Sequence, residues 1–287
     1  MIERAQIAVG LLVAADGRIL LQLRDNKPGI ASAGRWGFFG GHIEPGERPS
    51  EAFLREMQEE LCWRPPHFEH YRTRNVDGGG WHATSHAYAA HLNVPLDGLE
   101  QREGQAMALF APAALPDTAV DGIPAFVREF SASKVYHRMQ RAWSMITATA
   151  LLVDHDGRFL LQHRDDKPDI ANPGKWGSFG GQIEPYETPE DGFLREMEEE
   201  LSWKPSRYTL VNAYPLDAAG PRATLVYVYS ALVDVPPSAL VLGEGQGMDF
   251  FVPGDLPANT VPALRSLIEW YASSNAYDAL RGSSENA

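Results

Sequence analysis

One stretch of this chain occurs twice, and the repetition limits how the chain can fold. The first copy runs from Gly41 to Trp63 and the second from Gly181 to Trp203, with the same arginine and the same glutamates at the same spacing. The likeness extends further, because residues 11–65 and 151–205 align without a gap and are identical at most positions. A repeat of this length indicates two duplicated domains and not a short-period solenoid.

Each copy predicts a glycine-rich loop followed by an amphipathic helix. Pro49 and Pro189 stand where the helix would begin, because proline is suited to the first helical position. Thr188 is a good N-cap residue in the second copy. The helix of the first copy has an apolar stripe that needs a core to pack on, formed by Phe53, Leu54, Met57 and Leu61.

Three glutamates lie beside the apolar stripe in each helix, at positions i, i+3 and i+4, so their side chains converge. They are Glu56, Glu59 and Glu60 in the first copy and Glu196, Glu199 and Glu200 in the second. We expect them to face outward over the glycine loop. Converging carboxylates repel one another unless a cation neutralises them, and hard oxygen ligands suit Mg²⁺ or Mn²⁺. A solvated acidic helix face is the alternative, and the duplication of the set favours the metal site.

The spaced residues resemble the signature of the Nudix hydrolases, Gly-x5-Glu-x7-Arg-Glu-U-x-Glu-Glu-x-Gly-U, in which U is an aliphatic or bulky apolar residue. Gly41, Glu47 and Arg55 open the first match. Each copy departs at one fixed position, where Cys62 and Ser202 replace a glycine. A glycine there would leave the helix in a left-handed conformation, and another residue costs on the order of 1 kcal/mol. The departure concerns the helix exit and not the metal ligands.

The resemblance implies an α/β fold class, with two tandem Nudix-type α/β/α sandwich domains that each contain a mixed sheet. We place the domains at residues 1–141 and 142–287. Two such folds in one chain can pack as an intrachain pseudo-dimer.

The resemblance also implies a reaction, the Mg²⁺-dependent hydrolysis of a pyrophosphate bond in a nucleoside diphosphate linked to another group, such as a nucleotide or nucleotide sugar. Mn²⁺ is the alternative cofactor. The glutamates of each helix would hold the metal, together with a main-chain carbonyl of the loop at Gly40 or Gly180. Arg55 and Arg195 would orient these glutamates. The competing class is a regulatory protein that binds a nucleotide with one or both domains and does not turn it over.

A carboxylate must also remove a proton from the attacking water. Similarity between the halves returns at Glu103 and Glu244, and in the family a glutamate from a late loop near the pyrophosphate can act as general base or extra metal ligand. A glutamate of the helix itself, Glu59 or Glu199, is the rival candidate.

Charged loops precede the glycine-rich segments and offer contacts for the substrate. Their cations, Arg24 and Arg164 among them, could hold phosphate oxygens or a base edge, and Arg35 and Lys175 within the glycine-rich segments are further candidates. Solubility through local ion pairs is the alternative. Phe39 and Phe179 stand where many nucleotide-directed relatives have proline, which weakens any transfer of substrate preference from those relatives.

The flanking segments predict strands and closing helices. Each half opens with two apolar runs joined by an Asp-Gly turn, at residues 7–14 and 18–23 and again at 145–153 and 158–163. The copies diverge at 75–82 and 214–220, which suggests different leaving groups or bases, with drift in an exposed loop as the alternative. Each half ends in one helical stretch, Pro124 to about Arg141 and Pro262 to about Leu280.

A formal net charge of −13 argues against a nucleic-acid polymer as partner and leaves a small nucleotide-type substrate. The N-terminus does not resemble a signal peptide and no apolar run is long enough for a membrane span, so we expect a cytoplasmic protein with no membrane partner. The single cysteine, Cys62, excludes an internal disulfide and fits a reducing compartment.

Overall fold

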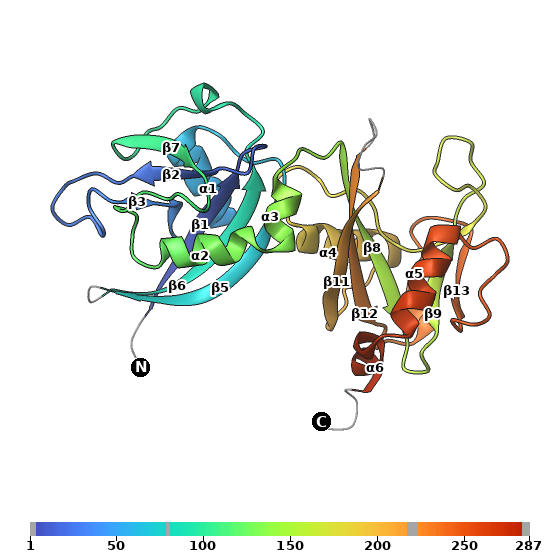
Figure 1. Ribbon diagram of the computed structural model, residues 1–287. Helices are drawn as coiled ribbons and strands as arrows, with labels where there is room; N and C mark the ends of the chain where they lie inside the picture. The colour runs from blue at the N-terminus through green and yellow to red at the C-terminus, as the bar shows by residue number, and fades with distance from the viewer. Residues whose placement is uncertain (1–3, 79–80, 217–222, 283–287) are drawn as a thin grey trace. The chain divides into compact units, whose positions relative to one another are not determined.

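The computed structural model describes residues 4–78, 81–216 and 223–282 (Figure 1). The chain divides into two compact units, one of residues 1–142 with 185–188 and the other of residues 143–184 with 189–287.

The first unit is built on a mixed sheet of seven strands. Its main path has the order β3-β2-β1-β6-β5, while β4 pairs with β1 and β7 pairs with β2. The central pair, β1 and β6, is parallel and the other pairs are antiparallel. The strands are β1 (Ala5–Val13), β2 (Ile19–Leu23), β3 (Trp36–Gly37), β4 (Phe39–His42), β5 (Phe68–Gly78), β6 (Trp81–His91) and β7 (Ala106–Phe110).

Helices cover both faces of this sheet, because side chains alternate between the faces along β1. Ala8 and Leu12 belong to the core under one helix, and Leu11 and Val13 belong to the core under the other two. In Figure 1 the two closing helices lie in front of the sheet. The helices are α1 (Pro49–Leu61), α2 (Ile123–Ser131) and α3 (Lys134–Met139), with a short 3₁₀ turn η1 (Leu96–Gly98).

The second unit repeats this plan on a six-stranded sheet of order β10-β9-β8-β12-β11, with β13 paired to β9. The parallel pair is β8 and β12. The segment equivalent to β4 is too irregular to count as a strand, but it forms a bridge between Thr147 and Gln182 and accepts the N–H groups of Ala148 and Ala150. The elements are β8 (Met145–Val153), β9 (Phe159–His163), β10 (Trp176–Gly177), α4 (Pro189–Leu201), β11 (Tyr208–Leu216), β12 (Thr224–Leu232), η2 (Pro237–Ala239), β13 (Gly247–Phe251), α5 (Pro262–Ala272) and α6 (Asn275–Gly282). The predicted α/β class with two mixed sheets is confirmed.

The prediction of one closing helix in each half is wrong. α2 ends at Ser131 and α3 begins at Lys134, because Ser133 leaves the helical conformation and its Oγ accepts from the backbone N–H of Tyr136 at 3.2 Å. α5 and α6 are separated in the same way, with Ser274 Oγ accepting from the N–H of Tyr277 at 3.3 Å. A serine hydroxyl that caps a new helix stops the preceding one.

The segments in which the copies diverge are largely strands and not loops. Residues 75–78 end β5, residues 81–82 begin β6, and residues 214–216 end β11. The remaining divergent residues, 79–80 and 217–220, lie outside the part of the chain that the structure describes. Among the helices of the described part, none is long and apolar enough to cross a membrane.

Candidate active site

The glycine loop of each half brings backbone against the carboxylates of the following helix. Gly40 and Gly180 have φ of 125° and 121°, and a Cβ on either would lie 2.1 Å or 2.3 Å from a carbonyl oxygen of the neighbouring strand. A Cβ on Gly41 would lie 2.5 Å from Oε1 of Glu56. Only glycine fits at Gly40, Gly41 and Gly180. Because glycine has no side chain, the backbone can lie close to the glutamates.

Arg55 joins four groups around the start of the site. Its Nε and Nη2 donate to Glu47 at 3.0 and 3.1 Å, and its Nη1 donates to Glu56 at 2.8 Å and to Glu59 at 3.0 Å. Nη2 also donates to the carbonyl of His42 at 2.8 Å. The guanidinium therefore ties the helix carboxylates to the loop, and these contacts raise its own pKa.

The second half repeats the contacts of this arginine to the helix glutamates and the loop carbonyl at closely similar distances. Arg195 Nη1 donates to Glu196 at 2.8 Å and to Glu199 at 3.0 Å, and Nη2 donates to the carbonyl of Gln182 at 2.9 Å. Two separate stretches of sequence thus form the same network.

The last glutamate of each set points inward. Glu60 and Glu200 are 4% and 5% exposed, and each accepts the N–H of the loop glycine, Gly40 or Gly180, at 2.7 Å. The expectation that all the glutamates face outward is wrong for these two, because the loop N–H needs an acceptor inside the fold. Burial is the main cause that raises the pKa of each carboxyl to about 7. Gln22 also donates to Glu60, at 3.3 Å.

The late-loop glutamates lie close enough to act on the helix carboxylates. The negative charge of Glu103 contributes to raised pKa values at Glu56 and Glu60, after the larger effect of burial. Glu244 does the same at Glu200. The structure therefore brings together residues that the sequence separates by more than forty positions.

The acidic groups fit a hard divalent cation in their chemistry. Oxygen donors, a side-chain-free space at Gly41 and carboxylates that repel one another are the features that Mg²⁺ or Mn²⁺ requires. Within the described residues, however, no three His, Cys, Asp or Glu side chains are already arranged to hold an ion. Nη1 of Arg55 bridges Glu56 and Glu59, while the carboxylate of Glu60 bonds to the N–H of the loop glycine.

The predicted substrate-binding cations differ in their surroundings. Arg24 and Arg164 each donate from Nε to a loop carbonyl, at 2.9 and 2.8 Å. Arg35 is occupied by Asp121, with contacts of 2.7 and 3.1 Å, and by a carbonyl at 2.6 Å. Lys175 has no ion-pair partner among the residues that the structure describes. A role for these four residues in substrate binding stays a prediction.

A cavity of about 230 Å³ adjoins the glycine loop of the first half, on the sheet face covered by α2. Gly40, Gly41 and Arg24 line one part of it, and Arg74 and Ser85 line another. Much of the remaining lining is apolar, formed by Ile7, Val9, Phe38, Val76, Val120 and Ile123, and His42 and Asp121 add polar groups. Arg74 was not among the site residues predicted from the sequence. An arginine on every second position of a strand, at residues 72 and 74, is the signal that could have found it.

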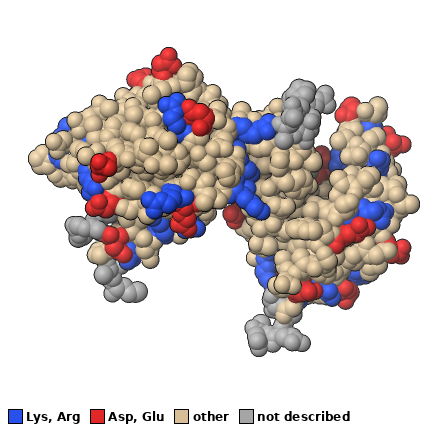
Figure 2. Space-filling view, in the orientation of Figure 1, with Lys and Arg blue, Asp and Glu red and all other residues tan. Residues whose placement is uncertain are grey.

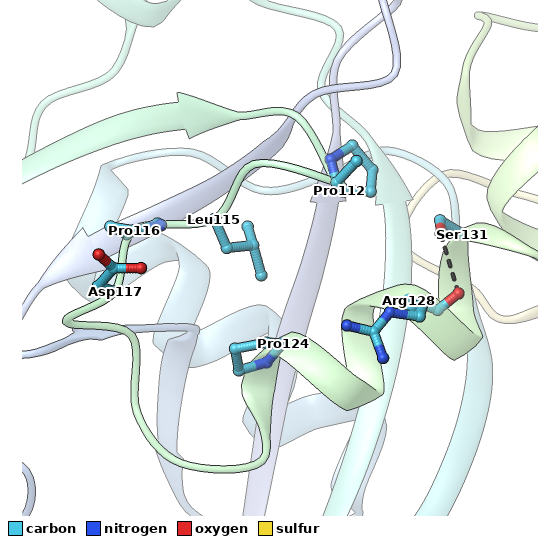
Figure 3. A pocket seen from close by; sticks show the side chains of 8 residues that line it. Pro112, Leu115, Pro116, Asp117, Pro124, Arg128 and Ser131 are labelled. Carbon is cyan, nitrogen blue, oxygen red and sulfur yellow. Dashed lines mark hydrogen bonds between the residues drawn. The ribbon is translucent and has the colours of Figure 1, made fainter.

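A second hollow in the first unit, of about 610 Å³, lies between the segment after β7 and α2 (Figure 3). Pro112, Leu115, Pro116 and Pro124 supply much of its lining, and Arg128 lies at its edge. It contains neither the glycine loop nor any helix glutamate, so we do not assign the reaction to it.

The loop glycines, the arginine and the helix glutamates are the residues whose spacing resembles a family signature, and a family model matches both halves. The family model described as NUDIX domain matches residues 4–130 and 143–271, and the chain therefore belongs to this family. The predicted resemblance is confirmed.

Individual relatives match shorter parts of the chain. It is 39% identical over 57 residues to a CTP pyrophosphohydrolase of Escherichia coli (strain K12), covering 20% of this chain and 41% of the relative. It is 38% identical over 66 residues to an 8-oxo-dGTP diphosphatase of the same strain, covering 23% and 50%. The chain thus spans half or less of the length of these curated relatives. The crystal structure of a MutT NUDIX hydrolase from Burkholderia pseudomallei aligns with a TM-score of 0.37 and 29% identity, over 44% of this chain and 95% of that one.

Proposed function

We propose that the protein is a Mg²⁺-dependent hydrolase of pyrophosphate bonds in nucleoside diphosphates linked to a second group, and that both halves catalyse the reaction. The observation that carries the proposal is the repeated network, because Arg55 and Arg195 hold their glutamates at matching distances. A network retained only as a solvated surface would not need a buried glutamate against the loop in both halves.

The metal would be held by the three glutamates of each helix and the carbonyl of Gly40 or Gly180. When bound, it would neutralise the pyrophosphate and increase the acidity of a water molecule. Arg55 and Arg195 keep the glutamates in place, and Glu47 fixes Arg55 from the far side. Glu103 and Glu244, with Glu59 and Glu199 as rivals, are the groups that could accept a proton from water. Arg24, Arg35, Arg164 and Lys175 are the proposed contacts to the substrate.

The substrate is proposed to be a small molecule and not a nucleic-acid polymer. On the face shown in Figure 2, acidic and basic side chains are mixed over each unit, and the formal net charge is −13. A polymer backbone calls for a continuous basic surface. A nucleotide needs only a few cations close to a metal.

The test is an assay of the full chain against nucleoside triphosphates, oxidised nucleotides, nucleotide sugars, dinucleoside polyphosphates and ADP-ribose, with analysis of the products. We expect hydrolysis with Mg²⁺ or Mn²⁺, complete loss with excess chelator, and recovery when the metal is restored. Full activity in excess chelator would contradict the metal assignment. Binding of a nucleotide without turnover would show a regulatory protein instead.

A further inference from the structure

Arg74 is a half-buried cation with unused hydrogen-bonding capacity. It lies on β5, and its Nε is buried without a hydrogen-bond partner. Its guanidinium carbon lies 3.7 Å from the ring centroid of Phe126. Burial lowers the pKa of Arg74, because the surrounding apolar groups stabilise its charge poorly. A buried donor without an acceptor is rare in folded proteins and calls for an explanation.

The neighbouring arginine of the same strand differs from Arg74 in this respect. Arg72 points to the same side of the sheet, and it donates to the carboxylate of Glu129 at 2.5 Å. Glu129 is also the acidic group whose charge acts on Arg74, but it forms its ion pair with Arg72. Arg74 lines the cavity and Arg72 does not.

The strand register places Arg74 at the end of the cavity away from the glycine loop. Arg74 pairs with Ser85, Ser85 pairs with Ile7, and Ile7 pairs with His42 of β4. Three strand spacings separate Arg74 from β4, a distance of about 14 Å between backbones. In the proposed reaction the glycine loop and the helix glutamates act on the pyrophosphate. Arg74 would therefore contact the group at the other end of the substrate.

The second half has different chemistry in the equivalent row. There Tyr214 pairs with Val226 and Val226 pairs with Thr147, in the places of Arg74, Ser85 and Ile7. Thr149 and Ser178, which replace Val9 and Phe38, form a hydroxyl pair at 2.5 Å. The second half therefore has a neutral tyrosine in place of Arg74 and hydroxyl side chains in place of Ile7, Val9 and Phe38, whereas Ser85 is replaced by Val226.

We propose that Arg74 determines the substrate of the first half by donating from its guanidinium to the two adjacent acceptors of a 6-oxopurine base. An arginine pairs with O6 and N7 of guanine in this way, whereas adenine offers a donor in place of O6. The apolar side chains Ile7, Val9 and Phe38 supply surfaces for the faces of a planar base. This inference rests on the proposed function and assigns different bases or leaving groups to the two halves.

The experiment uses the full chain with Glu200→Gln, so that the second half is silent. Initial rates with GTP, ITP, ATP and CTP are compared for this protein and for the same protein with Arg74→Gln, Arg74→Tyr or Arg72→Gln. Arg74→Tyr installs the residue that the second half has at the equivalent position, and Arg72→Gln is the matched control. Thermal unfolding verifies each variant, and calorimetry of GMP and AMP binding without metal gives a readout independent of turnover.

We expect kcat/KM for GTP and ITP to exceed that for ATP by roughly 5- to 150-fold, the discrimination of one bidentate arginine contact. Both Arg74 variants should remove this preference through KM, and Arg72→Gln should retain it. Equal GTP-to-ATP ratios in the Arg74 variants and the parent would overturn the inference and leave the proposed hydrolysis intact. If no substrate of the full panel is hydrolysed but Arg74→Gln selectively weakens GMP binding, the base assignment stands and the proposed hydrolysis fails.

Discussion

At the scale of single residues, the helix exits show how this chain departs from its family's pattern. Cys62 and Ser202 stand in place of glycine and adopt φ of 51° and 49°, which is the left-handed region. The N–H of Cys62 bonds to the carbonyl of Gln58, and that of Trp63 bonds to the carbonyl of Met57. These bonds close the helix in the manner of a Schellman motif, so the conformation is retained although the residue is not suited to it.

We predict that Ser202→Gly stabilises the second unit. Ser202 is exposed, so the change removes little packing and relieves the strain of a side chain at positive φ. The free energy of unfolding should rise by about 0.5 to 1 kcal/mol. Thermal unfolding followed by calorimetry measures the change. Ser273→Gly is the matched control, because Ser273 also ends a helix but has φ of −91°, and it should destabilise the protein. An unchanged or lower unfolding temperature for Ser202→Gly would mean that the site carries no strain.

At the scale of elements, α1 and α4 present the same acidic network while the sheets beside them differ. Glu60 and Glu200 each accept the N–H of a loop glycine. The same carboxylate therefore holds the loop and contributes negative charge to the site. The strand positions across the sheet, Arg74 and Tyr214, are not alike. Each unit therefore has the same kind of acidic site, but the residues across the sheet from that site differ between the units.

We predict that Glu60→Gln and Glu200→Gln, made separately, leave different substrate profiles. Glutamine keeps the size of the side chain and an oxygen for the loop N–H but removes the charge that a divalent metal needs. Each variant should retain the activity of the unaltered half, and the double variant should have none. Rates across the same substrate panel measure the profiles. Identical residual profiles would mean that the halves are redundant or that only one is active.

At the scale of the whole molecule, one chain carries two complete folds, each with its own cores on both sheet faces. Each unit thus has the buried apolar clusters that a separately folding domain requires. We propose that the two halves of this chain pair with each other as an intrachain pseudo-dimer, as separate chains pair in some family members. We place the boundary between the halves at residues 141 and 142.

We predict that fragments 1–141 and 142–287 associate when they are expressed separately and mixed. Separation would expose the surface through which the halves pair, and the centres of such surfaces are more apolar than ordinary surface. Light scattering or analytical ultracentrifugation of each fragment and of the mixture measures the mass. Stable soluble monomers that do not associate would show that the two domains are only joined by the chain.

Much of the fold was accessible from the sequence because its signals are local. The helices at Pro49 and Pro189 begin where proline favours a helix start, and the strand pairs around the Asp-Gly turns follow their apolar runs. Each half was predicted to end in one helix and ends in two. A serine within a helical pattern can cap a new helix or face solvent, and the local sequence does not distinguish the two. The outward orientation of Glu60 was wrong for a related reason, because its acceptor role depends on a glycine twenty positions earlier.

The sequence by itself determined the duplication, the family and the identity of the acidic and arginine residues, because these depend on residue type and on spacing within one helix. Only the tertiary structure decided that the charge of Glu103 acts on Glu56 and Glu60, and that Arg74 reaches a cavity shared with the glycine loop. Both relations depend on the register of the strands and on which side chains are buried without a hydrogen-bond partner. Neither property follows from positions along the chain, because pairing across a sheet joins residues that local sequence does not relate.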